Sequence, residues 1–72
     1  MNHFIWILDA NGNQFCQMAS MVVAFQRHQV GTVIFLNNGG QVISQTAPED
    51  VENRLNTYYT QVLLTLHKGG RP

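Results

Sequence analysis

The chain has 72 residues, of which 44% are hydrophobic and only 11% are charged. This length gives one small domain with a single core and leaves no room for a second one. Four Lys or Arg balance four Asp or Glu, so the net charge is zero. The composition therefore lacks the basic excess that drives electrostatic binding to nucleic acids or anionic membranes.

Most of the polar character comes from neutral amides, seven Asn and seven Gln. Amide side chains produce no long-range repulsion between molecules, so a neutral amide-rich chain has little to keep its copies apart. A domain of fewer than about 80 residues also has a small core, for which oligomerisation is one remedy. Cys16 is the only cysteine and excludes an intrachain disulfide. We therefore expect a homodimer.

The single cysteine also bears on location, because a chain without a possible disulfide suits a reducing compartment. The apolar run at residues 4–8 is too short for a membrane span or for the core of a signal peptide, and no basic segment precedes it. We expect a cytoplasmic protein.

The first strand is predicted at residues 3–8, which are rich in β-branched and aromatic side chains. Alternation places Phe4 and Trp6 on one face and Ile5 and Ile7 on the other. Since both faces are apolar, we expect both to be covered.

A turn is predicted at residues 9–13, where Asn-Gly accommodates positive φ, and it is followed by a return strand at 14–18. Residues 18–28 fit two structures. Apolar side chains there fall at helical spacing but also alternate, and ten residues do not decide between the two. We expect a strand at 20–27, with a helix as the alternative.

Residues 32–36 are an uninterrupted run typical of a buried strand, and the hairpin after it has the clearest local signal in the chain. Asn38 and Gly39 can occupy the two positive-φ positions of a type I′ turn. The more polar return strand is expected at 41–45.

A helix is predicted directly after this strand, with Thr46 as the N-cap and Pro48 in the first turn. Glu49, Asp50 and Glu52 place negative charge at the positive end of the helix dipole. The helix carries an apolar stripe formed by Val51, Leu55, Tyr58, Tyr59, Val62, Leu63 and Leu66.

The predicted fold is α+β, with four or five short antiparallel strands in hairpins followed by one long C-terminal helix. We expect a single domain over residues 1–68 and a flexible tail at 69–72.

The sequence offers little for chemistry. Metal binding would require His3, Cys16, His28 and His67 to converge, and their spacing is unlike that of zinc motifs. As a nucleophile Cys16 would need a histidine to activate it, but it lies on a predicted hairpin strand, where a free cysteine is commonly packing material. The four acidic residues are explained by the turn and the start of the helix. We therefore predict no enzymatic activity, metal or cofactor.

An interaction surface is the favoured hypothesis. Leu64 projects from the side of the helix opposite the apolar stripe, where a monomer would expose it. We expect it to form an apolar patch for a second copy or an unknown protein partner. The patch would comprise Leu64, Tyr58 or Tyr59, and Trp6 or Phe35.

The alternative is a small nucleic-acid-binding regulator. Its contacts would be Arg27, His28, Lys68 and Arg71, which are few and scattered.

The order of elements resembles the small FlbD-type flagellar-operon proteins, which are associated with swarming motility. The matching residues are Ile7-Leu8, Asn11-Gly12, Val22 with Phe25, the run from Thr32 to Gly39, and Pro48-Glu49-Asp50-Val51. The likeness spans about residues 4–55 and implies no functional residue. Trp6 and the helix end depart from the family pattern. The strands are also similar to the front half of a LytTR-type DNA-binding domain, but its basic recognition segment is missing.

Overall fold

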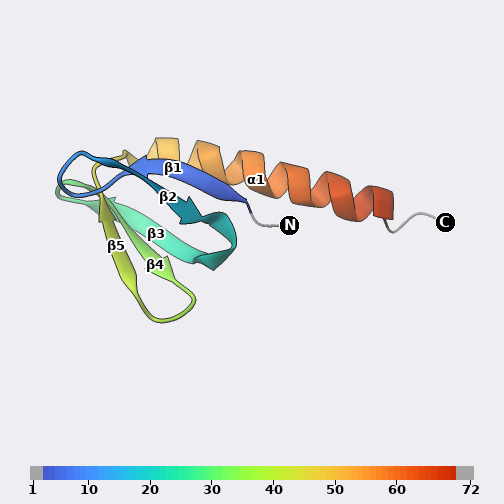
Figure 1. The fold of residues 1–72 in the computed structure, drawn as a ribbon, viewed down its shortest axis with the longest axis horizontal. Coiled ribbons are helices and arrows are strands. Elements are labelled where there is room, and N and C mark those ends of the chain that lie inside the picture. The colour runs from blue at the N-terminus through green and yellow to red at the C-terminus, as the bar shows by residue number, and fades with distance from the viewer. Residues whose placement is uncertain (1–2, 70–72) are drawn as a thin grey trace.

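The computed structural model describes the main chain of residues 3–69 and the side chains of residues 3–60. The described part contains five strands, one 3-10 turn and one helix (Figure 1). In chain order they are β1 (Phe4–Leu8), β2 (Gln14–Met18), η1 (Ala19–Met21), β3 (Val22–His28), β4 (Gly31–Leu36), β5 (Gln41–Ser44) and α1 (Pro48–Gly69). The α+β class, with antiparallel strands in hairpins before a C-terminal helix, is confirmed.

The strands form two antiparallel sheets, β1-β2 and β3-β4-β5. An isolated antiparallel bridge between Asp9 and Ser44 joins the end of β1 to the end of β5. At the same point the Ser44 hydroxyl donates to the main-chain carbonyl of Leu8 at 2.5 Å. The two sheets are therefore connected at one corner.

The turn between β1 and β2 forms as predicted. One carboxylate oxygen of Asp9 accepts hydrogen bonds from the main-chain N–H groups of Asn11 and Asn13, at 2.8 and 2.9 Å. Gly12 has a φ of 86°, which a side chain would disfavour. Asp9 and Gly12 thus supply the local hydrogen bonds and backbone conformation that the turn requires.

The ambiguous segment after β2 is mainly a strand, and the helical alternative is wrong apart from the short turn η1. The pairing of β3 with β4 shifts register between Val22 and Ala24, so Val23 is a bulged residue that is 64% exposed. Alternation in the sequence predicted the strand, but it did not indicate the extra residue.

The turn between β4 and β5 differs from the type I′ prediction, because Asn38 does not have a positive φ. Only Gly39 does, at 87°. The N–H of Gly39 donates to the carbonyl of Leu36, and the side chain of Asn38 accepts from the N–H of Gly40. A single glycine of positive φ therefore completes a three-residue loop, which reverses the chain between β4 and β5 in place of the predicted two-residue turn.

The core lies between the two sheets and is closed by α1, which contacts both β1 and β3. Val51 and Leu55 of α1 are buried, and Tyr58 packs against them half-buried, which confirms the start of the predicted apolar stripe. The side chains of Val62, Leu63 and Leu66 lie outside the described residues. The buried apolar residues are Ile5, Ile7, Ala19, Val22, Ile34, Val51 and Leu55.

The predicted N-cap is wrong. The helix begins at Pro48, and the carbonyl of Ala47 accepts from the N–H groups of Asp50 and Val51. The hydroxyl of Thr46 instead accepts a hydrogen bond from the main-chain N–H of Leu8. Thr46 therefore links the start of the helix to β1 rather than capping it. Within the described residues, no helix combines the length and apolar character needed to cross a membrane.

Candidate functional site

The first strand presents one apolar face to the core and another to the surroundings. Ile5 and Ile7 are 6% and 2% exposed, whereas Phe4 and Trp6 are 52% and 58% exposed. The expectation that both faces of this strand are covered is therefore wrong for the single chain. Within it, α1 and the second sheet close only the face that carries the isoleucines.

The exposed aromatic residues have apolar neighbours on β2. Phe4 is paired with Met18 and Trp6 with Cys16, and residues directly opposite each other share a face. Met18 is half-buried and Cys16 is exposed. The six residues of this surface, which we call the outer face, are uncharged. They are Phe4, Trp6, Leu8, Gln14, Cys16 and Met18.

Two open hollows lie between β1 and α1, and we call them together the edge groove. One, of about 280 Å³, lies beside Phe4 and is bordered on α1 by Arg54, Thr57 and Tyr58. The other, of about 450 Å³, lies nearer Leu8. Trp6 and Arg54 border both hollows. Among the described residues, the salt bridge that forms joins Arg27 to Glu49, so it does not involve Arg54.

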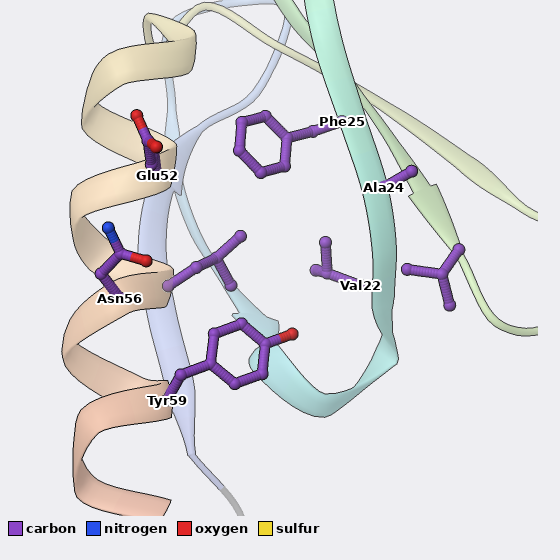
Figure 2. Close-up of a pocket in the computed structure, with 8 residues that line it drawn as sticks. Val22, Ala24, Phe25, Glu52, Asn56 and Tyr59 are labelled. Atoms are coloured by element: carbon purple, nitrogen blue, oxygen red, sulfur yellow. The ribbon is translucent and has the colours of Figure 1, made fainter. Parts of the chain in front are cut away.

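A further groove, of about 350 Å³, separates α1 from β3. Figure 2 shows Phe25 and Val22 of β3 pointing towards the helix and Tyr59 of α1 lying across from Val22. Glu52 and Asn56 form its helical rim. The apolar interior and the polar rim make it a smaller counterpart of the edge groove.

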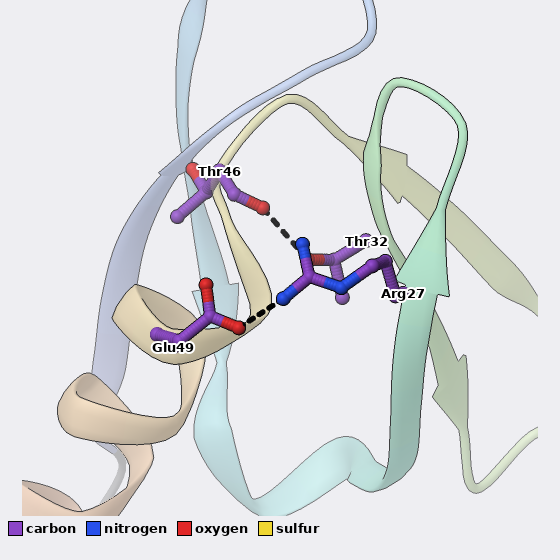
Figure 3. A network of polar contacts seen from close by, with 4 residues as sticks. All are labelled: Arg27, Thr32, Thr46 and Glu49. Carbon is purple, nitrogen blue, oxygen red and sulfur yellow. Dashed lines mark hydrogen bonds and ion pairs between the residues drawn. The ribbon is translucent and has the colours of Figure 1, made fainter.

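Arg27 and Glu49 form an ion pair that joins β3 to the first turn of α1 (Figure 3). Nearby, the buried hydroxyl of Thr32 donates to the carbonyl of Thr46 at 2.7 Å. These contacts fix the beginning of the helix to the larger sheet. The guanidinium of Arg27 is thus already engaged by a carboxylate within the chain.

The predicted interaction patch is brought together only in part. Trp6 and Tyr58 border the same hollow, and the rings of Tyr58 and Tyr59 have centroids 4.9 Å apart. Phe35, by contrast, follows the buried Ile34 on β4 and so points to the sheet face away from the core. The side chain of Leu64 lies outside the described residues.

The residues of the nucleic-acid alternative are not gathered into a basic patch among the described residues. Besides the engaged Arg27, the ring of His28 accepts a hydrogen bond from the N–H of Val30 at the hairpin end. The side chain of Lys68, and all of Arg71, lie outside the described residues.

Groups for chemistry are dispersed over the part of the chain that the structure describes. There, no three His, Cys, Asp or Glu residues converge as metal ligands. Cys16 is exposed on β2, and the tilted rings of His3 and Tyr58 have centroids 5.3 Å apart. The side chain of His67 lies outside the described residues.

Sequence reasoning missed three parts of this surface. Cys16 and Met18 could have been found, because the hairpin turn at residues 9–13 sets which residues of its two strands pair. Arg54 could not, since a charged residue in a helix is usually solvated and only the packing of α1 brings it beside Trp6.

Comparison with known proteins gives no relative: no family model, no curated protein and no solved structure matches this chain. The resemblance to FlbD-type proteins therefore stays a prediction.

Proposed function

We propose that the chain is a non-enzymatic protein-interaction module of the cytoplasm that forms a homodimer through its outer face. The observation that carries the proposal is the exposure of Phe4 and Trp6 side by side on one strand. Tryptophan is usually well buried, and a contiguous exposed apolar surface is typical of an interaction site. The single exposed cysteine, Cys16, supports a reducing compartment.

A second copy is the partner best suited to this face. In a two-fold symmetric dimer each residue of a patch approaches the same patch of the partner, so a patch with charges of one sign would repel itself. The outer face has no charge, and the whole chain has no net charge. Packing of two such sheets face to face would place the aromatic side chains of both copies in one layer.

The exposed area of its two aromatic residues indicates which size class of interface the outer face can form. At the exposures given above, Phe4 and Trp6 together present about 200 Å² per copy. This is well below the roughly 800 Å² per partner of a standard interface. We therefore expect a small and reversible dimer interface, which should be sought at micromolar and higher concentrations.

Sedimentation velocity over a range of concentrations tests the proposal. The wild-type chain should shift from the mass of one chain to that of two. Cys16→Glu places a charge in the middle of the outer face, opposite Trp6, and should keep the chain monomeric. Val23→Glu is the matched control, because Val23 is also exposed but lies on β3, and it should leave the dimer intact.

A wild-type chain that sediments as a monomer at all concentrations would contradict the proposal. So would a Cys16→Glu variant that dimerises like the wild type. Circular dichroism should give the same spectrum for all three proteins, since both substituted side chains are exposed.

A further inference from the structure

The main chain of β1 has a free edge, and hydrogen bonds in its hairpin determine which residues face it. The N–H of Asp9 donates to the carbonyl of Asn13 at 2.7 Å, so these two residues face each other across the turn. In an antiparallel ladder such hydrogen-bonded pairs alternate with pairs whose main-chain N–H and C=O groups point away from the partner strand, and the next pair here is of the second kind. That residue on β1 is Leu8, and the same orientation recurs at Trp6 and Phe4.

The chain itself supplies partners for the first of these three residues. The N–H of Leu8 donates to the hydroxyl of Thr46 at 2.9 Å, and the carbonyl of Leu8 accepts from the hydroxyl of Ser44. The hydrogen bonds along this edge of β1 end at Leu8. Among the described residues, the outward main-chain groups of Trp6 and Phe4 have no hydrogen-bonding partner.

The edge groove lies along this free edge. Its smaller hollow, beside Phe4 and Trp6, is bordered by Arg54, and none of the residues that border it is acidic. Asp50 borders the larger hollow, towards Leu8. The free edge at Phe4 and Trp6 therefore has beside it a positively charged helix residue, Arg54, that forms no salt bridge among the described residues.

We propose that the edge groove binds an extended segment of another protein as an added strand, antiparallel to β1, with the pattern apolar–Asp/Glu–apolar. The two apolar residues lie opposite Phe4 and Trp6 and extend the outer face. The acidic residue lies opposite Ile5, on the side of β1 that α1 covers, and its carboxylate pairs with Arg54. The added strand continues the antiparallel sense of the bridge between Asp9 and Ser44.

The acidic residue shows why the occupant is a different protein and not a second copy. Of the four acidic residues of this chain, three lie in the first two turns of α1. The fourth, Asp9, lies in a turn and its carboxylate already accepts two main-chain hydrogen bonds. No strand of this chain therefore carries a carboxylate to Arg54. The inference goes beyond the proposed dimer, because it uses the edge of β1 and not the outer face.

Fluorescence anisotropy with labelled peptides tests the added strand. The probe is acetyl-Thr-Val-Glu-Val-Thr-amide with a fluorescein on an added C-terminal lysine. In the proposed pairing the N–H of each valine faces β1 and that of the glutamate faces away. N-methylation of either valine should weaken binding about tenfold or more, whereas N-methylation of the glutamate should change it less than about twofold. Binding that is equally sensitive at all three positions, or no binding of the unmodified peptide at millimolar protein, would overturn the proposal.

Charge variants test the role of Arg54. The wild-type chain should prefer the Glu peptide over its Lys counterpart by about fivefold, the range of a partly exposed ion pair. Arg54→Gln should abolish this preference. Arg27→Gln should keep it, although it changes the net charge of the chain equally. Loss of the preference in both variants, or in neither, would contradict the assigned role.

The same titrations on Cys16→Glu separate this inference from the proposed dimer. Cys16 lies on β2, away from the free edge of β1. In that variant, N-methylation of either valine should still weaken binding and N-methylation of the glutamate should still leave it almost unchanged. This result is expected whether or not the wild-type chain dimerises. Binding that is lost with Cys16→Glu would show that the peptides report the outer face and would overturn the inference.

Discussion

The hydroxyl of Thr46 accepts a hydrogen bond from the main-chain N–H of Leu8 at 2.9 Å, across 38 positions of sequence. The carbonyl of Thr46 accepts a second bond from the buried hydroxyl of Thr32. Thr46, which lies two residues before α1, thus connects the smaller sheet, the larger sheet and the segment that leads into the helix. On the side of β1 that faces away from β2, the hydrogen bonds to this corner end at Leu8. The main-chain edge at Trp6 and Phe4 is therefore left open.

Removal of this hydroxyl should destabilise the fold. Thr46→Val keeps the shape of the side chain but leaves the N–H of Leu8 without an acceptor, which costs about 1–3 kcal/mol of unfolding free energy. Urea denaturation of both proteins measures the difference. Thr57→Val is the control, because Thr57 is exposed and its hydroxyl only returns to the carbonyl of Asn53, and it should change stability by less than about 0.5 kcal/mol. Equal effects would show that the corner is not a stabilising contact.

Gly31, at the start of β4, lies very close to the main chain at the end of β5. A Cβ at this position would collide with the main chain of Ser44 and Gln45. We expect Gly31→Ala to lower the unfolding free energy by about 3 kcal/mol or more. Gly39→Ala is the comparison, since Gly39 has a positive φ but open space around it, and its cost should be about 1 kcal/mol. The reverse order in thermal or urea denaturation would contradict the packing of β4 against the end of β5.

The opposite faces of β1 should respond differently to truncation. Ile7→Ala removes a buried core side chain and should cost about 2–5 kcal/mol. Trp6→Ala removes a larger but mostly exposed side chain, and in dilute solution it should cost only about 1–2 kcal/mol. Denaturation followed by circular dichroism avoids dependence on the tryptophan signal. A larger loss for Trp6→Ala would place the indole in the core.

The ion pair of Arg27 and Glu49 should contribute little to stability. The two side chains are 67% and 64% exposed, so water and salt screen their attraction. A double-mutant cycle with Arg27→Gln and Glu49→Gln should give a coupling below about 1 kcal/mol. That coupling should fall further in 1 M NaCl. A coupling that is strong and independent of salt would contradict the exposed geometry.

The elements that sequence predicted well are those set by neighbouring residues. The run at residues 32–36 is an uninterrupted series of β-branched and apolar residues, which favours a buried strand. The Asn-Gly turn at residues 11–12 has a position that favours glycine. The stripe of α1 likewise predicted the burial of Val51 and Leu55. Such local signals gave the antiparallel strands and the helix in the correct order.

The features that sequence did not predict depend on how distant segments meet. Thr46 resembles an N-cap in isolation, but the end of β1 lies close enough for Leu8 to use its hydroxyl. Trp6 belongs to a strand that is apolar on both faces, and only the position of α1 decides which face stays exposed. The position of Arg54 beside the same hollow as Trp6 arises in the same way and has no signal in the sequence.

The emission of Trp6 tests the dimer most directly, because it is the only tryptophan and lies in the proposed contact. As the protein concentration rises through the micromolar range, burial of the indole against a second copy should shift the emission maximum to shorter wavelength. The shift should be absent in Cys16→Glu and present in Val23→Glu. An emission maximum of an exposed indole at every concentration of the wild-type chain would contradict the account.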